Sequence, residues 1–361
     1  MSNLPYSSPP RYHAMFSSIA ELAVHTDRTG EWPARQFEAL NRAGILAWGI
    51  PENFQGESTP ATEIARFYLD CSASCLTTAF VLSQRNAAVS RLVAARNNPL
   101  AESLLPRLAR GEIFATVGIS HLSTSRQHLQ RPSVTLLETD SGYRLDGVVP
   151  WVTGVHHADL LVTGGTLPDG RQLLLALDAT TPGLERGSAA EMLALNASDT
   201  GHLQLRNVYV PHEAALTEPS NSVMKSGGGG TGSLTTSTIA LGVAGRAVHA
   251  LEHEACSRTE LQSESNKLRE EWVAMVEELL IAEEQSPTME ILTTQTLRAR
   301  ANSLVLRAAQ AYLTATKGAG FIAGHLAERT LREATFFLVW SCPQPVAQAA
   351  LRQFACTPSW T

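Results

Sequence analysis

The sequence lacks an excess of basic residues. Its 28 lysines and arginines are outnumbered by 34 aspartates and glutamates, which gives a formal net charge of −6 at pH 7. Proteins that hold the phosphate backbone of a nucleic acid need a basic surface, so no nucleic-acid partner is expected. An anionic cofactor would need only a local group of cations, and the net charge of the whole chain does not reveal such a group.

The sequence also shows no long apolar run and no secretory signal pattern in its first residues. No stretch reaches the 18 or more apolar residues of a membrane-spanning helix. The first residues contain no apolar segment that is followed by a small-residue cleavage site, as a secretory signal would. We therefore expect a cytoplasmic protein without a membrane span.

Cysteine is scarce, odd in number and irregularly spaced. Five cysteines in a long chain indicate reduced thiols rather than a disulfide framework. Cys71 and Cys75 lie four residues apart in an apolar helical stretch, and we interpret them as buried small hydrophobic residues. Because no histidines and carboxylates show ligand spacing, no metal site is expected.

The sequence does contain enough apolar residues for two or three domains. Apolar residues make up 44% of the chain and charged residues 17%, which is typical of a globular protein. Apolar residues recur at helical spacing over residues 17–110, whereas residues 113–211 form short β-rich runs. Residues 139–142 and 168–170 are hairpin turn signals, because Asp begins each turn and Gly supplies a positive φ. This pattern predicts a small antiparallel barrel or sandwich.

A glycine-rich segment, SGGGGTGS at residues 226–233, follows the β-rich part. We interpret it as a linker rather than a phosphate-binding loop, because no Lys-Ser/Thr pair ends it and no strand precedes it. From Leu234 onward the pattern is helical, and Trp272, Val276 and Leu279 share one apolar face. An order of helices, strands and helices makes a Rossmann sheet unexpected. The predicted divisions are an N-terminal helical domain at 1–112, a β domain at 113–216, a linker at 217–233 and a C-terminal helical domain at 234–361.

Several motifs resemble, in their order and spacing, those of the acyl-CoA dehydrogenase family. Residues 27–57 resemble its first helical region, and residues 104–112 resemble the lead-in to its β domain. GYRLDGVVPWVTGVHHADLLV, residues 142–162, resembles its strand-turn-strand that contains Trp-Ile/Val-Thr. Residues 317–334 resemble its glycine turn and the Glu-Arg helix that follows. The resemblance implies an α+β, mainly α fold, with an N-terminal helical domain, a middle β-barrel domain and a C-terminal helical bundle.

The same resemblance implies FAD, bound in a cleft between the middle and last domains. Trp151 would pack on the isoalloxazine, and Thr153 would direct its hydroxyl at the flavin N5 region. A flat aromatic side chain can bury the ring, and a hydroxyl can donate or accept a hydrogen bond as the redox state changes. The alternative is a buried strand tryptophan beside a β-forming threonine, but the flanking match favours flavin contact.

The match is weaker where the family holds the FAD pyrophosphate. Thr124 keeps a hydroxyl in a strand that has otherwise lost the family's Thr-Glu-Pro-x-x-Gly-Ser-Asp motif. Arg258 is the nearest candidate for an arginine that reaches the FAD of a partner subunit, although no Phe-Gly follows it. Lys317 precedes Gly318 where the family turn begins with glycine, and its long side chain could either attract the pyrophosphate or obstruct it.

The largest departure concerns the catalytic base. Most family members carry a Glu that removes the proton α to a thioester carbonyl, and Ser341 occupies that position here. The alternative family position, on the helix that opens the last domain, offers Thr235 and Thr236. A hydroxyl without a basic neighbour is a very poor general base, so the catalytic residues stay unknown.

Three histidines are the remaining bases. His156 and His157 follow Thr153 closely, and His121 lies in the weakened flavin strand. We interpret each one as a turn or surface histidine rather than as a catalytic base.

Three functions stay open on this sequence. The first is an FAD-dependent oxidoreductase that acts on an acyl thioester such as an acyl-CoA, or on a similar small molecule, with a displaced base. The second is a flavin monooxygenase on the same fold, which does not need the glutamate, and the third is an inactive binding or assembly module. The resemblance also implies a homodimer or homotetramer, because the family completes its cofactor site across subunits. The apolar face of Trp272, Val276 and Leu279 and the helix expected at residues 298–317 are expected to contribute to that assembly. The alternative is that both segments only fill the core of their own domain.

Overall fold

The structure is a computed structural model that describes residues 8–95, 98–122, 132–221, 223–225, 234–285, 291–340 and 342–356. Its first helices are α1 (His13–Thr29), α2 (Ala34–Arg42), α3 (Ala61–Ser74), α4 (Leu76–Ala94) and α5 (Asn98–Ala109). Its strands are β1 (Ala115–Val117), β2 (Val134–Thr139), β3 (Gly142–Val152), β4 (Leu160–Thr166), β5 (Gln172–Asp178), β6 (Leu184–Arg186) and β7 (Gly201–Pro211). The last helices are α6 (Thr235–Ser257), α7 (Gln262–Gln285), α8 (Ile291–Gly320), α9 (Leu326–Thr335) and α10 (Gln344–Ala355). The order of helices, strands and helices is the one that the sequence predicts.

Helix α4 connects the N-terminal helices to the rest of the molecule. Phe80, Val81 and Leu82 follow one another along it and are all buried. The helix contacts α3, α5, α6 and strand β1, and it is buried on most sides although it carries two arginines, Arg85 and Arg91. Cys71 and Cys75, which lie just before α4, are buried free thiols, as the sequence predicts.

The strands form one curled sheet. Over the described residues it has seven strands in the order β1-β4-β2-β3-β7-β6, with β5 paired to β4. Strands β1 and β2 pair with β4 in parallel, while the remaining pairs are antiparallel. The sheet is therefore mixed, and the expectation of a wholly antiparallel barrel or sandwich is wrong on this point. The core of the curl includes Leu145, Val149, Val152, Leu203, Leu205 and Val208.

Both predicted turns join antiparallel neighbours, but for different physical reasons. Residues 139–142 connect β2 to β3, and residues 168–170 connect β4 to β5. Gly170 has a φ of +88°, as predicted for a turn glycine. Gly142 does not have a positive φ, so the predicted reason is wrong there. A Cβ at Gly142 would lie 2.2 Å from the carbonyl oxygen of Val210, so glycine allows β3 and β7 to approach closely.

The C-terminal helices form a bundle that shares one apolar core with the N-terminal helices. Trp272, Val276 and Leu279 on α7 are buried inside this chain, and the Trp272 indole N–H donates to the carbonyl of Leu241 at 2.8 Å. The expectation that this face packs on a partner subunit is therefore wrong, because the chain's own helices cover it. Exposed apolar side chains lie elsewhere in this region, including Leu351 on α10.

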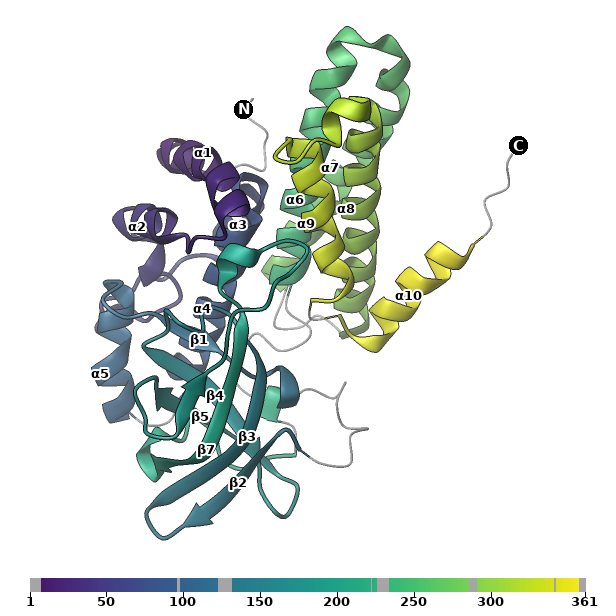
Figure 1. Ribbon diagram of the computed structural model, residues 1–361. Coiled ribbons are helices and arrows are strands. Elements are labelled where there is room, and N and C mark those ends of the chain that lie inside the picture. The colour runs from purple at the N-terminus through teal and green to yellow at the C-terminus, as the bar shows by residue number, and fades with distance from the viewer. Residues whose placement is uncertain are drawn as a thin grey trace.

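The bundle has one end near the sheet and one end remote from it (Figure 1). Helix α6 begins at the end nearer the sheet and ends at the remote end, and its 23 residues span about 34 Å. Helix α8 runs to the same remote end and α9 returns toward the sheet (Figure 1), while α10 packs against α8.

Candidate functional site

The end of strand β3 presents a tryptophan to solvent. Trp151 is 51% exposed, although Val149 and Val152 on the same strand are completely buried. Other apolar side chains of the sheet are exposed too, including Leu137 and Tyr209, but Trp151 offers the largest flat ring among them. The alternative of a buried strand tryptophan is therefore wrong, and the ring of Trp151 is accessible to a flat ligand.

Thr153 lies two residues beyond Trp151 and is buried. Its hydroxyl oxygen lies 3.2 Å from the hydroxyl oxygen of Thr200, which in turn lies 2.8 Å from that of Ser198. We call these three side chains the hydroxyl chain. The sequence analysis found Thr153 but missed the other two, and the only local signal was the run of turn-forming residues at 196–200.

The loop at residues 195–200 also holds the backbone of the turn that follows Thr153. The amide of Gly154 donates to the carbonyl of Ser198 at 2.9 Å, and the amide of Val155 donates to the carbonyl of Asp199 at 3.0 Å. Leu195 and Asp199 adopt left-handed conformations, with φ of 66° and 48°. Such backbone conformations are strained for residues with a Cβ, so the surrounding contacts must fix them.

His156 and His157 lie in this turn and are partly exposed, as the sequence predicts. Asp199 accepts a hydrogen bond from the His156 amide at 2.8 Å, and its other oxygen lies 2.9 Å from His156 Nδ1. His157 stacks on Trp32, with ring centroids 4.2 Å apart. Burial lowers the pKa of His157. Both histidines are therefore held by contacts within the chain.

His121 differs from its predicted setting, because it is buried rather than a surface residue. Its Nε2 lies 2.9 Å from the carbonyl oxygen of Gly164 on β4. This contact fixes the ring against the sheet, so the structural role of His121 is to join its short helical turn to β4.

Two of the predicted pyrophosphate residues lie together at the remote end of the bundle. Arg258 ends α6 and donates to Glu254 Oε2 at 2.6 Å and to the carbonyl of Ala315 at 2.7 Å. Gly318 lies on α8, three residues after Ala315. A Cβ built on Gly318 would meet no atom within 4 Å. The preceding Lys317 has a φ of 54°, outside the helical range. The chain's own packing therefore does not require glycine at position 318.

The predicted site residues thus form two separate groups within one chain. Trp151 and Thr153 lie at the end of β3. Arg258 caps the end of α6 and Gly318 lies near the end of α8, and these helix ends are remote from the sheet (Figure 1). Thr124, the remaining pyrophosphate candidate, lies outside the described residues.

Ser341, which stands at the usual position of the base, also lies outside the described residues. The segment before it packs against α4. Phe336 and Trp340 pack against Phe80 of α4, with ring centroids 5.0 and 5.1 Å from it. Arg298 on α8 donates to the carbonyl of Trp340 at 2.8 Å. At the alternative position of the base, Thr235 is the first residue of α6.

A buried carboxylate that the sequence analysis missed lies on α9. Glu333 pairs with Arg246 of α6, whose Nε also donates to the Thr330 hydroxyl at 3.1 Å. Arg329 Nε lies 4.0 Å from the other Glu333 oxygen. We call Arg246, Arg329 and Glu333 the charged cluster. Because two guanidinium groups engage Glu333, it is not a free base.

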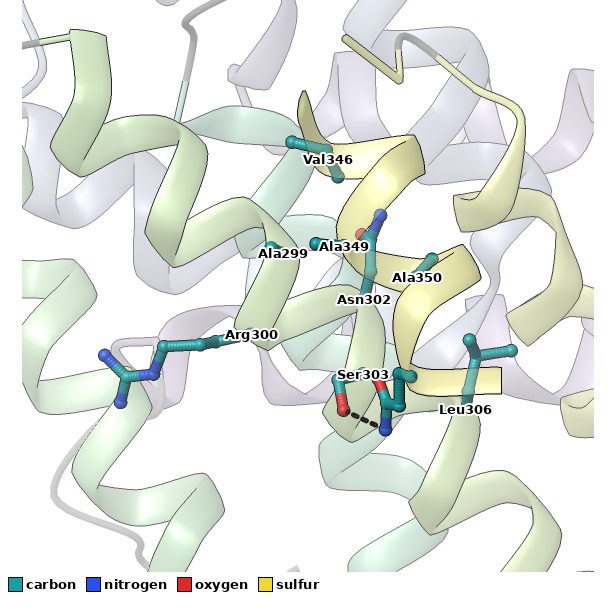
Figure 2. Close-up of a pocket in the computed structure, with 9 residues that line it drawn as sticks. Ala299, Arg300, Asn302, Ser303, Leu306, Val346, Ala349 and Ala350 are labelled. Atoms are coloured by element: carbon teal, nitrogen blue, oxygen red, sulfur yellow. Dashed lines mark hydrogen bonds between the residues drawn. The ribbon is translucent and has the colours of Figure 1, made fainter. Parts of the chain in front are cut away.

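The described residues contain no group of three or more His, Cys, Asp and Glu side chains that could hold a metal ion. Over the same part of the chain, no helix is long and apolar enough to cross a membrane. A groove of about 260 Å³ lies between α8 and α10, where Gln353 reaches Ser303 at 2.9 Å (Figure 2). The four described cofactor candidates, Trp151, Thr153, Arg258 and Gly318, do not line this groove.

Comparisons with known proteins agree with this architecture. The family model described as acyl-CoA dehydrogenase, N-terminal domain, matches residues 15–112. The mitochondrial short-chain specific acyl-CoA dehydrogenase of Mus musculus is 21% identical over 206 residues, which cover 56% of this chain and 50% of that protein. The chain spans about half the length of the curated relatives that it matches.

Solved structures match over a much longer part of the chain. The structure of a glutaryl-coenzyme A dehydrogenase with glutaryl-CoA superposes with a TM-score of 0.82 at 17% identity, covering 96% of this chain and 95% of that one. The dibenzothiophene monooxygenase of Paenibacillus sp. A11-2 superposes with a TM-score of 0.78 at 14% identity, covering 94% and 93%. At these identities the likeness establishes the fold alone.

Proposed function

Because this chain belongs to the acyl-CoA dehydrogenase family, we propose that it is an FAD-dependent oxidoreductase that acts on an acyl thioester or a related small molecule. The observation that carries this proposal is the half-exposed ring of Trp151, with the buried side chain of Thr153 two residues later in the sequence. Trp151 would stack on the isoalloxazine, and Thr153 would supply a hydrogen bond at its edge. When bound, FAD would supply the hydride or oxygen chemistry that no side chain can perform.

The residues of the remote group also suit an anionic cofactor. A guanidinium has five N–H donors, and Arg258 uses two of them within its own chain, so donors remain for a pyrophosphate. Gly318 leaves open space where a side chain would stand. Since this group is remote from Trp151 in one chain, it would serve the FAD of a neighbouring chain in a homodimer or homotetramer. A monomer by light scattering, with and without FAD, would remove Arg258 and Gly318 from the cofactor site.

The first test is FAD binding by calorimetry and absorption. The unaltered chain should take up FAD, and Trp151→Ala should weaken the binding by about 1–3 kcal/mol because the stacking surface is lost. Leu137→Ala, which removes another exposed apolar side chain from the same sheet, should leave binding unchanged and serves as the control. A chain that binds no FAD at about 1 mM would overturn the proposal and favour an inactive binding or assembly module.

A flavin monooxygenase is the second candidate. It is favoured because a serine and a threonine, Ser341 and Thr235, stand at the two positions where the family carries its carboxylate base. Loss of a positioned base slows proton abstraction by about 10²–10⁴. Two measurements separate the candidates. In the first, the FAD-loaded protein is mixed without oxygen with a panel of acyl-CoA thioesters, and rapid loss of the oxidised flavin absorbance supports a dehydrogenase with a displaced base. In the second, the reduced protein is exposed to oxygen, and substrate-dependent oxygen uptake supports a monooxygenase.

A further inference from the structure

Lys317 holds a backbone conformation that favours glycine. Its φ is 54° and its ψ is −146°, at the edge of the extended region of positive φ. Gln55 and Leu195 also have positive φ, but their ψ values of 23° and 22° place them in the left-handed helical region. A residue with a Cβ tolerates the left-handed helical region better than the extended one, which is populated almost only by glycine. The backbone of Lys317 is therefore more strained than that of Gln55 or Leu195.

The tight turn at the end of α8 imposes this conformation. A Cβ on Gly320 would lie 1.8 Å from Thr316 Oγ1, so the chain folds back closely over the last helical turn. The carbonyl of Ala315 is satisfied from another helix, because Arg258 donates to it at 2.7 Å. None of these contacts involves the side chain of Lys317. A glycine at position 317 would allow the same turn with less strain.

The side chain of Lys317 brings a free positive charge to this helix end. It is exposed, and it has no ion pair or hydrogen bond within the residues that the structure describes. Arg258 lies close by, because it binds the carbonyl two residues before Lys317. Glu254 pairs with Arg258 at 2.6 Å and offsets its charge. Of these three side chains, Lys317 therefore supplies the uncompensated charge.

We propose that Lys317 binds the pyrophosphate of FAD and makes the protein select FAD over flavins that lack a pyrophosphate. This inference rests on the proposed function, in which the remote end of the bundle serves the FAD of a neighbouring chain. A pyrophosphate in FAD carries two negative charges, and an ammonium group binds such an anion as a compact point charge. A charge gained at the cofactor offsets the strain, as it does where strained residues form binding sites.

The first test compares FAD with riboflavin, which has the same isoalloxazine but no pyrophosphate. Lys317→Met keeps the length of the side chain and the strained backbone, and it removes only the charge. Fluorescence titration should show a loss of about tenfold in affinity for FAD at low salt and a smaller loss at high salt, where exposed charges are screened. Riboflavin affinity should not change, because Trp151 and Thr153 are unaltered. Lys317→Arg keeps the charge and should restore most of the FAD affinity.

The second test separates strain that serves binding from strain that is incidental. Lys317→Gly removes both the charge and the strain. It should weaken FAD binding about as much as Lys317→Met does, yet raise the thermal midpoint of the cofactor-free protein by about 2 °C. A merely structural residue would not give a more stable protein that binds FAD less well. Lys267→Met is the matched control, because Lys267 near the start of α7 is already paired with Glu264 at 3.6 Å. It should change neither quantity.

The outcomes are distinct. A higher FAD affinity in Lys317→Gly would show that the side chain obstructs the cofactor, and it would overturn the inference. Unchanged FAD affinity in Lys317→Met, or equal losses for FAD and riboflavin, would overturn it as well, and both results leave the flavoprotein proposal standing. If the unaltered chain binds neither flavin, the proposed function fails and the inference fails with it.

Discussion

Two clusters of buried polar side chains, the hydroxyl chain and the charged cluster, differ in charge and in how completely their hydrogen bonds are made. In the β region, Thr153, Thr200 and Ser198 are neutral, and each hydroxyl contacts another member of the chain. In the helical bundle, the charged cluster sets two guanidinium groups against one carboxylate. Arg246 Nη1 and two nitrogens of Arg329 have no hydrogen-bond partner in the described part of the chain.

This difference separates a group suited to function from a group that determines stability. A neutral, hydrogen-bonded hydroxyl chain costs less to bury than an ion pair, and its member Thr153 is the proposed flavin contact. A buried ion pair is costly to desolvate and is very sensitive to the loss of one partner. Changes in the charged cluster should therefore act on folding, whereas changes in the hydroxyl chain should act on the cofactor.

The strongest test of this contrast is removal of the carboxylate. Glu333→Gln would leave two buried guanidinium groups without a counter-charge, and we expect a loss of about 3–5 kcal/mol in the free energy of unfolding. Urea denaturation measures this loss. Glu185→Gln, which breaks an exposed ion pair with Arg206, should cost less than about 1 kcal/mol. If both variants lose the same small amount, the charged cluster does not determine stability.

A smaller and opposite effect is expected from Arg329. Its Nε lies 4.0 Å from Glu333, and its Nε and Nη1 have no hydrogen-bond partner among the residues that the structure describes. Arg329→Met would remove an incompletely paired buried charge and leave the pair of Arg246 and Glu333 intact. We expect unchanged stability or a gain of about 1 kcal/mol. Arg246→Met is the matched control and should lower stability, because it takes away the hydrogen-bonded partner of Glu333. A marked loss in Arg329→Met would show that Glu333 needs both arginines.

Local patterns explain how much of this molecule could be predicted. The order of helices and strands follows from apolar spacing within each segment, and the family motifs lie in continuous stretches such as residues 142–162. The apolar face of α7 was also visible, but its spacing could not say whether the chain or a partner would cover it.

Contacts between distant segments explain what was missed. Thr200 meets Thr153 across 47 positions of the sequence, and Arg246 meets Glu333 across 87. Neither pair leaves a periodic signal, because each depends on how two elements pack. The positive φ of Asp199 could not be predicted either, since the contacts of its neighbours impose it.

The smallest expected effect is a pH dependence that belongs to the bundle and not to the hydroxyl chain. His249 on α6 packs edge-on against Trp272 at 5.1 Å, and its Nε2 is buried without a hydrogen-bond partner in the described residues. Burial lowers the pKa of His249 from its ordinary value of 6.5. The folded chain therefore binds this proton less readily than the unfolded chain, so the contribution of His249 to stability is present above about pH 6.5 and is lost as the pH falls below it.

Urea denaturation at pH 7.5 and at pH 5 should show a smaller acid-induced loss in His249→Gln than in the unaltered protein. His253→Gln, on an exposed part of the same helix, should keep the full loss. The effect of Thr200→Val on stability should be the same at both pH values, because no member of the hydroxyl chain titrates in this range. An acid response that follows Thr200 rather than His249 would contradict the division between the two buried groups.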